Sequence, residues 1–424
     1  MFLTDYLYEH NRYLNIVGII LILGVAWLFS RKRAHINYKL VGWAFFLQCA
    51  TAFCVLNTSI GRWIVSGVAF NVSKIYQFAG EGIAFVFGDL ANVNALWGFI
   101  FAIQILPVII FFGALTAVLF HFGIIQHVVN GVSYVMRPLL GTSGAETLCA
   151  IANSFLGQTE APLLIRNYLK NMTKSEMLVV MVSGMATISG SILVVYASMG
   201  VPATSLLVSS VMAIPASILI AKILYPETEK SPTQAEAHVS TKPTTGNVFD
   251  AIFVGTSDGL QLAINVGAML IAFLSLIAML NYILSYGAYK FNYLLSLAGV
   301  SALLPDDLSL NLIFSYLFAP FAYLLGFTGN DALVAGKLLG IKVAINEMVA
   351  FKELVRNGLS ERATNIMTYA LCGFSNFSCI GIQVGGIGAL VPEKRAWLTE
   401  LGMMAVLGGA LSNILSAMVV SLLV

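Results

Sequence analysis

Long runs of apolar residues separated by short polar segments dominate the chain. Residues 14–30 and 95–120 are two such runs, and neither contains a charged side chain. A helix of roughly 20 residues is long enough to cross the apolar core of a bilayer. The runs are continuous rather than alternating, which argues against the strands of a membrane β-barrel. The pattern therefore predicts an all-α polytopic membrane protein.

The apolar runs predict about eight transmembrane helices. They lie near residues 14–30, 39–57, 95–120, 178–198, 204–224, 253–284, 363–390 and 396–423. Residues 61–89 are apolar but are interrupted by Arg62, Lys74 and Glu81, so we expect a helix in the membrane interface there. A second interfacial helix, with weaker amphipathy, is expected at residues 121–137.

Two further segments are apolar at both ends and polar in the middle. They are residues 144–173, which contain the stretch NSFLGQTEAPLLIR, and residues 329–355. Their apolar arms are too short to cross a bilayer alone, and non-helical backbone at membrane depth must be buried in protein or line a wet cavity. We therefore expect two re-entrant helical hairpins. Pro162 should lie in the first turn of the first hairpin's returning helix, where its missing N–H costs nothing.

A weak internal repeat relates the two hairpins. Each is followed by an apolar helix with a small, polar, glycine-flanked break, GMATISGSI at residues 184–192 and CGFSNFSCIG at residues 372–381. Ser189 follows Glu160 by 29 positions, and Asn376 follows Glu347 by 29 positions. Many secondary transporters build a midplane site from inverted repeats with broken helices. The spacing predicts inverted repeats of this kind.

Composition and charge agree with a membrane protein and indicate its orientation. Only 10% of the 424 residues are charged, the mean hydropathy is +0.88, and the net charge is +2. No basic tract is long enough to indicate nucleic acid as a partner. The basic cluster at residues 31–39 should stay on the cytoplasmic side, which would leave the N-terminus outside.

Two glutamates inside apolar segments are the strongest candidates for a binding role. A carboxylate at membrane depth costs about 2.5–3.5 kcal/mol on insertion scales, so Glu160 and Glu347 should be paired, hydrated or bound to a ligand. The alternative is a purely structural bond to a neighbouring helix. Gln158 and Thr159 form a donor–acceptor cluster beside Glu160, or they cap the half-helices of the hairpin.

Hard oxygen ligands gather near the first break. Asn153, Thr187 and Ser189 supply side-chain oxygens, and the carbonyls of Leu156 and Ile188 could complete a shell for Na⁺. Half-helix ends with exposed carbonyls suit cations. The alternative is that the Thr187 and Ser189 hydroxyls bond back to their own helix, as such hydroxyls often do.

The second break combines amide, hydroxyl and thiol groups with aromatic rings. Asn376, Ser378 and Cys379 lie between or beside Phe374 and Phe377, an arrangement that suits a flat, hydrogen-bonding ligand. Ordinary core packing is the alternative, above all for Phe377. No nucleophile–base pair, phosphate loop or metal-ligand spacing is present in the sequence, so we do not predict an enzyme.

These motifs together have a family resemblance. GQTEAPLLIRNYL, GMATISGSILVVYASMGVP, INEMVAFKEL and TYALCGFSNFSCIGIQVGGIGAL resemble segments of the concentrative nucleoside transporters. The resemblance extends from about residue 35 to the C-terminus, and the length is similar to that of bacterial members. It implies eight spanning helices, two re-entrant hairpins, interfacial helices and a homotrimer, in which a transport domain moves against a fixed scaffold.

The resemblance also implies a division of the chain. We expect N-terminal scaffold helices with an interfacial helix in residues 1–120, a first repeat of the transport domain in 121–225, a polar linker in 226–247, a scaffold helix with an interfacial segment in 248–328, and the second repeat in 329–424. The linker is rich in Pro, Thr and Ser and has too few apolar residues to bury a core.

Roles for single residues follow from the resemblance in the same way. The nucleobase contacts implied are Gln158, Thr159 and Glu160, with Ile192 as an apolar contact. The ribose side would use Glu347 and Asn376 with Phe374 nearby, and Cys379 stands where serine is common in the family. The Na⁺ site would use Asn153 and Thr187 with the carbonyls of Leu156 and Ile188.

The sequence thus predicts a Na⁺-coupled symporter in the inner membrane of a bacterium. It would import nucleosides such as uridine, cytidine or adenosine by an elevator-type motion, with Na⁺ as coupling ion and no other cofactor. One alternative is coupling to protons through Glu160 or Glu347. A different class of function is a passive channel or a receptor for a small polar ligand.

Overall fold

The chain folds into helices throughout the part that the structure describes. This computed structural model describes residues 6–92, 96, 100–229, 245–297, 299 and 301–424, and every regular element in those ranges is helical. Most of the predicted linker at residues 226–247 and the first residues of the apolar run at 95–120 lie outside the described ranges.

Seven helical stretches of the described chain are long and apolar enough to cross a membrane. They are Tyr6–Leu28, Tyr38–Asn57, Phe101–His121, Lys174–Ser198, Ala203–Leu224, Val248–Leu297 and Pro392–Leu423. Each matches one predicted span. The eighth predicted span, at residues 363–390, consists of α18 (Glu361–Leu371) and α19 (Phe377–Leu390), which are separated at the break that the sequence predicts there.

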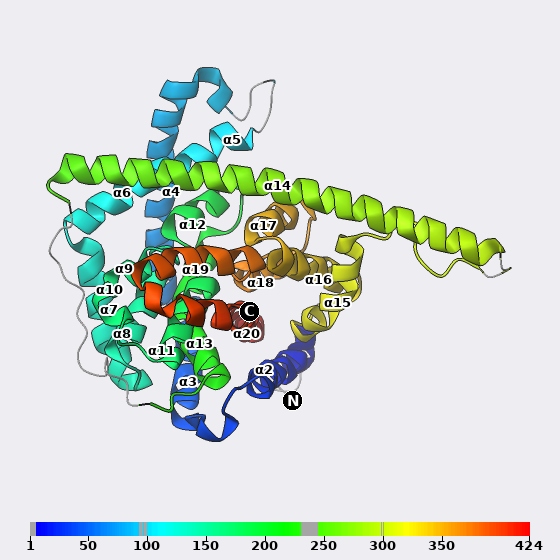
Figure 1. Cartoon of the computed structure of the whole chain (residues 1–424), viewed down its shortest axis with the longest axis horizontal. Coiled ribbons are helices and arrows are strands. Elements are labelled where there is room, and N and C mark those ends of the chain that lie inside the picture. The colour runs from blue at the N-terminus through cyan, green and yellow to red at the C-terminus, as the bar shows by residue number, and fades with distance from the viewer. Residues whose placement is uncertain (1–5, 93–95, 97–99, 230–244, 298, 300) are drawn as a thin grey trace.

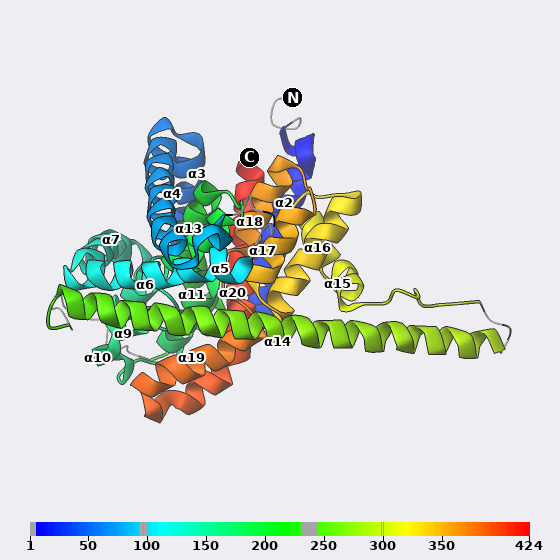
Figure 2. The same cartoon turned by 90° about the horizontal axis from the view of Figure 1, so that it is seen from above.

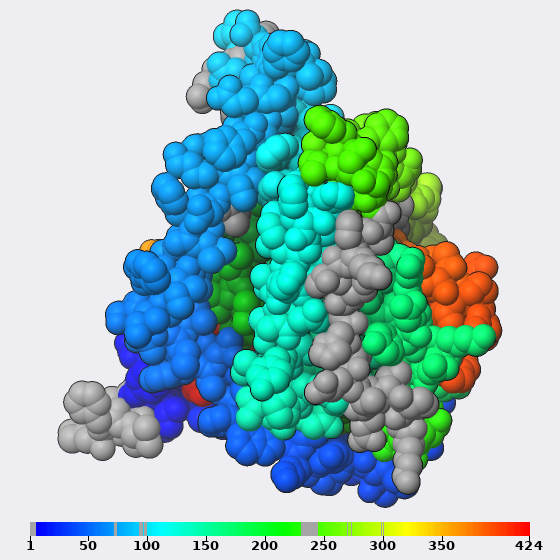
Figure 3. All heavy atoms as spheres, turned by 90° about the vertical axis from the view of Figure 1, so that its left-hand side faces the viewer, coloured from blue at the N-terminus to red at the C-terminus, as the bar shows by residue number. Residues whose placement is uncertain are grey.

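The described N-terminal part contains six α-helices. They are α2 (Arg12–Leu28), α3 (Tyr38–Asn57), α4 (Ser59–Phe87), α5 (Phe101–Gln104), α6 (Leu106–His121) and α7 (Ile124–Leu140). The helices α4 and α7 occupy the two segments predicted to be interfacial. The atoms of α4 and α6 lie side by side on the face that Figure 3 shows.

Two later groups of helices follow the same order of hairpin, broken helix and unbroken helix. The first group is α8 (Gly144–Asn153), α9 (Ala161–Leu164), α10 (Arg166–Leu169), α11 (Lys174–Ala186), α12 (Gly190–Ser198) and α13 (Ala203–Leu224). The second is α16 (Gly329–Ala344), α17 (Glu347–Arg356), α18, α19 and α20 (Arg395–Leu423). The shared order supports the predicted repeat. The first hairpin's returning arm differs from the prediction, because Ile165 separates it into two short helices.

One helix that was predicted only as an interfacial segment precedes the second hairpin. This helix, α15 (Leu310–Leu324), meets α16 at a bend of 113°. The first spanning helix, α2, packs on both α15 and α20, and Asn15 Nδ2 donates to the Leu324 carbonyl at 3.1 Å. The division into scaffold and transport domains stays a prediction, and α2 contacts one element on each side of it: α15 in the predicted scaffold and α20 in the second repeat.

The long helix α14 (Val248–Leu297) spans 50 residues and exceeds the predicted range of 253–284 at both ends. Figures 1 and 2 both show it running along one side of the molecule, with its C-terminal half extending beyond the other helices. Its N-terminal half packs on α6. Large apolar side chains such as Phe253 and Ile271 are exposed along α14, so this helix has an extensive apolar surface available to lipid or protein.

Glycines allow α6 and α14 to approach each other closely. Gly255 and Gly259 are spaced four residues apart on α14, and a Cβ on Gly255 would overlap the carbonyl oxygen of Gly113 on α6. A Cβ on Gly259 would lie 2.8 Å from the Ile109 carbonyl oxygen. Small residues with this spacing commonly bring membrane helices into backbone contact. The α6–α14 pair is therefore a close-packed unit.

Replacing Gly255 with alanine should destabilise this pair. The added methyl group has no room, and overpacking of this kind typically costs about 1–3 kcal/mol. Thermal unfolding of the purified protein in detergent should show a lower midpoint for Gly255→Ala. Gly287→Ala is the matched control, since a Cβ at that position of α14 has no neighbouring atom within 4 Å. Equal midpoints for the two variants would contradict the close packing.

Candidate functional site

Both broken helices end and restart at residues that favour such a break. In the first, α11 ends at Ala186, and Ser189 caps α12 by accepting the Ile192 N–H at 3.4 Å. In the second, α18 ends at Leu371, and Asn376 caps α19 by accepting the Cys379 N–H at 3.1 Å. Serine and asparagine are preferred N-caps. Both breaks therefore lie where the sequence predicts them.

The hairpin tips also have local causes. The first turns over residues 154–160 and restarts at Ala161, with Pro162 in the first turn as predicted. The second turns at Ile345 and Asn346, and the Asn346 side chain caps α17 by accepting the Val349 N–H at 2.9 Å. Glu347 is the first residue of α17, where the helix dipole favours a negative charge.

Backbone hydrogen bonds connect the first hairpin to the first break and the first break to the second. The Gly190 N–H donates to the Phe155 carbonyl at 3.1 Å. The Phe374 N–H donates to the Thr187 carbonyl at 3.3 Å. In uninterrupted helices these two N–H groups would bond within their own helix, so each break contributes a donor to a neighbouring segment.

A buried carboxylate lies at the second hairpin. Glu347 is 6% exposed; its Oε1 accepts from the Tyr196 hydroxyl at 2.8 Å and its Oε2 from Asn376 Nδ2 at 3.1 Å. The Tyr196 ring packs on Phe351 with the ring centroids 4.5 Å apart. The structure therefore brings Glu347 and Asn376 together, and it adds Tyr196, which the sequence interpretation missed.

A second polar cluster joins the first hairpin to α19. Gln158 Nε2 donates to the Cys379 sulfur at 3.2 Å, and Gln383 Nε2 donates to Gln158 Oε1 at 3.0 Å and to the Met181 carbonyl at 2.9 Å. Each end of the Gln158 amide still has capacity for a second hydrogen bond. The thiol of Cys379 thus accepts from an amide here, while its predicted contact with ribose stays a prediction.

The predicted Na⁺ ligands show one feature that suits a cation. Asn153 is fully buried; its Nδ2 donates to the Ser183 hydroxyl at 2.9 Å, whereas its Oδ1 has no hydrogen-bond partner among the described residues. The Thr187 hydroxyl donates to the Ser183 carbonyl at 2.8 Å, which is the back-bonding that the sequence left open. The lone pairs of the Thr187 hydroxyl oxygen remain available to a ligand. Leu156 and Ile188 are buried.

The remaining predicted residues are near these clusters in sequence but make fewer contacts. Glu160 is exposed, and its Oε2 accepts from the backbone N–H of Gly157 at 3.2 Å. Thr159 and Phe374 are half-buried, and Ile192 is buried. No hydrogen bond joins Glu160 to another predicted site residue in the described chain, so its assigned contact with a ligand stays a prediction.

Helical spacing could have indicated the residues that were missed. Gln383 lies four positions after Cys379, and Tyr196 lies four positions after Ile192, so each shares a helix face with a predicted residue. Ser183 likewise precedes Thr187 by four positions. Their partners are on other segments, however, and spacing along one helix does not identify those segments.

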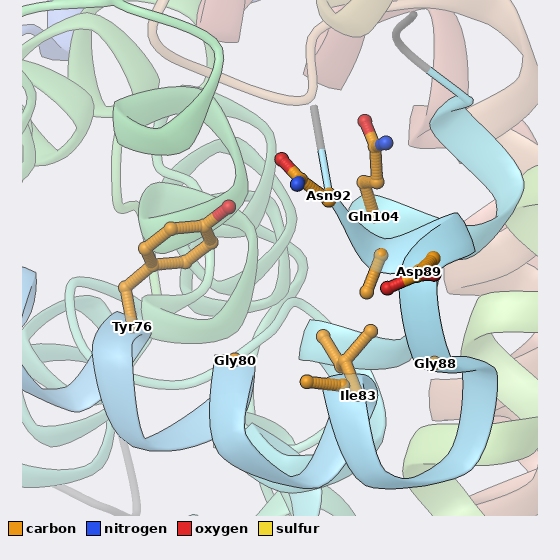
Figure 4. A pocket seen from close by; sticks show the side chains of 9 residues that line it. Tyr76, Gly80, Ile83, Gly88, Asp89, Asn92 and Gln104 are labelled. Carbon is orange, nitrogen blue, oxygen red and sulfur yellow. The ribbon is translucent and has the colours of Figure 1, made fainter. Parts of the chain in front are cut away.

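A cavity of about 410 Å³ lies elsewhere in the molecule. It is lined by residues of α4 and of the following turn, including Tyr76 and Asp89, together with Gln104 of α5 (Figure 4). None of the predicted site residues lines it. The polar clusters between the hairpins and α19 therefore remain the candidate site.

Comparison with known proteins gives matches over nearly the whole chain. A family model described as Na⁺ dependent nucleoside transporter C-terminus matches residues 205–421, and its N-terminal counterpart matches residues 17–90. A model described as nucleoside recognition matches residues 102–203. Together the three cover both hairpins, both breaks and α14.

Relatives and solved structures agree. The chain is 42% identical to an uncharacterized transporter of Haemophilus influenzae and 37% identical to the nucleoside permease NupC of Helicobacter pylori, in each case over 97% of both chains. The structure of CNTnw in an inward-facing, substrate-bound state matches with a TM-score of 0.89 and 38% identity over 97% of both chains. CNTnw variants in outward-facing and intermediate states match with TM-scores of 0.87 to 0.89. The chain belongs to the concentrative nucleoside transporter family.

Proposed function

We propose that this nucleoside transporter is a Na⁺-coupled symporter that imports nucleosides into a bacterial cell across the inner membrane. The observation that carries the proposal is the meeting of both hairpins at the start of α19. Asn376 bonds Glu347 of the second hairpin, and Cys379, three residues later, accepts from Gln158 of the first. The start of α19 thus contacts the Gln158 amide of the first hairpin and the Glu347 carboxylate of the second.

The nucleobase half of the proposal rests on the first hairpin. Gln158 offers both a donor and an acceptor, Thr159 adds a hydroxyl, and Glu160 adds an exposed carboxylate. A nucleobase edge also combines donors and acceptors, so these groups can match it. Ile192, in the first turn of α12, would supply an apolar contact for the base.

The ribose half rests on Glu347. Ribose presents neighbouring hydroxyl donors, and an ionised carboxylate is an acceptor with two oxygens. Tyr196 and Asn376 hold one oxygen each and so orient the carboxylate without using all of its lone pairs. Asn376 and Cys379 would be further contacts on this side, and Phe374 is the nearby aromatic ring.

The ion half rests on the Asn153 side-chain oxygen, which has no hydrogen-bond partner among the described residues. A fully buried amide oxygen without a partner is costly, and a cation would satisfy it. Thr187 and the carbonyls of Leu156 and Ile188 would complete the Na⁺ shell. The family description as Na⁺ dependent supports Na⁺ over H⁺ as the coupling ion.

Coupling between ion and nucleoside would follow from the short connections between these groups. Ordering of the first break by Na⁺ would act on the second break through the Phe374 N–H and the Thr187 carbonyl. Each ligand must then raise the affinity for the other by the same factor. Binding of the ion and the nucleoside together is then favoured over binding of either one alone.

The transport motion would be of the elevator type. The two repeats, predicted at residues 121–225 and 329–424, would move as one body against the scaffold that contains the α6–α14 pair. The related CNTnw structures in inward-facing, outward-facing and intermediate states support this motion. A homotrimer with the N-terminus outside and the basic cluster at residues 31–39 inside completes the proposal.

Uptake of radiolabelled uridine into proteoliposomes should depend on an inward Na⁺ gradient. We expect accumulation above the equilibrium level with the gradient and none when choline replaces Na⁺, because only the gradient supplies free energy. Liposomes without protein serve as the control for proteoliposomes that contain the purified protein. Accumulation driven by a pH gradient in Na⁺-free buffer would favour proton coupling, and uptake that never exceeds equilibrium would favour a passive channel.

Replacing Glu347 with glutamine should weaken ribonucleoside binding by about tenfold or more, since hydrogen bonds to charged groups contribute on this scale. The affinity should be measured by isothermal titration at saturating Na⁺. A dideoxynucleoside without the 2′ and 3′ hydroxyls should lose much less, because it makes no such bond.

Glu353→Gln is the matched control for Glu347→Gln. Glu353 lies on the same helix α17, and its carboxylate pairs with Lys337 at 2.8 Å rather than with the site. The control should bind uridine as the unaltered protein does. If Glu347→Gln also kept full affinity for ribonucleosides, the assigned ribose contact would be wrong.

A further inference from the structure

A buried lysine lies beside the second break and has no part in the proposed ligand contacts. Lys342 of α16 is 1% exposed, and its ammonium donates to the Ala370 carbonyl at 2.8 Å and to Asn413 Oδ1 at 2.6 Å. Burying an ammonium costs several kcal/mol unless its surroundings compensate. The groups that surround Lys342 must therefore compensate for the cost of burying its ammonium.

The first partner is a carbonyl that the second break sets free. In a continuous helix the Ala370 carbonyl would accept from the N–H of residue 374. The Phe374 N–H bonds the Thr187 carbonyl instead, and the Ala370 oxygen, in the last turn of α18, accepts from Lys342. Cations suit the C-terminal end of a helix, where the carbonyls carry partial negative charge.

The second partner, Asn413 of α20, contacts both breaks. Its Nδ2 donates to the Ala186 carbonyl at 2.7 Å and to the Cys372 carbonyl at 2.9 Å. The Ala186 oxygen is also free, because the Gly190 N–H bonds Phe155. One buried amide thus satisfies a carbonyl from each break, and its own oxygen accepts from Lys342.

The fit around this amide is close. A Cβ on Gly373 would overlap Asn413 Oδ1, and it would lie 2.8 Å from the carbonyl oxygens of Ala186 and Met185. Ser375, inside the second break, also donates to Asn413 Oδ1 at 3.4 Å. The ammonium therefore lies at the centre of the groups that shape the second break.

We propose that Lys342 is a positioning residue that acts as a tethered cation at the second break. It does for the second repeat what the exchangeable cation would do for the first, and this inference rests on the proposed function. By holding Ala370 and Asn413, the ammonium keeps the break in the geometry that presents Asn376 to Glu347. The second break thus has a permanent cation in the chain itself, whereas the first would gain its cation only when the ion binds.

The test compares Lys342→Met with Lys337→Met. Both substitutions remove an ammonium from α16, but Lys337 is half-buried and pairs with Glu353 away from the break. Uridine binding to the full chain in nanodiscs should weaken about tenfold or more for Lys342→Met at saturating Na⁺, since bonds to a charged group contribute on that scale. Lys337→Met should bind as the unaltered protein does.

A second readout separates positioning from general stability. Na⁺ alone should still raise the thermal unfolding midpoint of Lys342→Met, whereas uridine should add little to it. In Lys342→Ala, added ethylammonium should restore uridine binding, and ethanol, its neutral analogue of the same size, should not. Rescue by both compounds, or by neither, would overturn the role of the charge.

The outcomes distinguish this inference from the proposed function. If the unaltered protein shows no Na⁺-dependent uridine binding, the proposed function fails whatever Lys342 does. If the unaltered protein binds and Lys342→Met binds within about twofold of it, only the tethered cation is wrong, because a lost charge-assisted bond should cost more. If Lys342→Met does not fold, Lys342→Gln, which keeps an N–H donor without the charge, is judged by the same criteria.

Discussion

The need to satisfy backbone polar groups inside a membrane governs this structure. Two helices that could cross the bilayer are interrupted, and each break leaves carbonyl and N–H groups without their helical partners. Hydrogen bonds between segments satisfy these groups. The N–H groups of Gly190 and Phe374 donate to other segments, and the side chains of Asn413 and Lys342 donate to carbonyls that the breaks set free. These long-range bonds connect both hairpins, the two breaks and α20.

The same constraint brings the polar groups of the candidate site together in one region. Once the breaks have brought α12, α19 and the hairpin tips together, their side chains share partners, as Tyr196 and Asn376 share Glu347. The pair α6 and α14, in contrast, packs through glycines. In the proposed function, the polar body would bind the ligands and the α6–α14 pair would belong to the support against which that body moves.

The sequence predicted the class of fold well because apolar length is a local property. The positions of seven spanning stretches, both hairpins and both breaks follow from run lengths, N-cap residues and Pro162. The prediction was less accurate where length alone is ambiguous. The helix α14 is longer than its apolar centre, and α15 was taken for an interfacial segment. Each of these depends on neighbouring segments as well as on local composition.

By itself, the sequence determined which residues are too polar for their surroundings, among them Asn153, Gln158, Glu160, Glu347 and Asn376. Only the tertiary structure decided what those residues contact. Tyr196 and Glu347 are 151 positions apart, and Gln158 and Gln383 are 225 apart. Hydropathy and spacing report how one segment is built, whereas a hydrogen bond between segments depends on how they pack. For that reason Lys342 and Asn413 became recognisable as partners only once α16 and α20 were seen to meet at the second break.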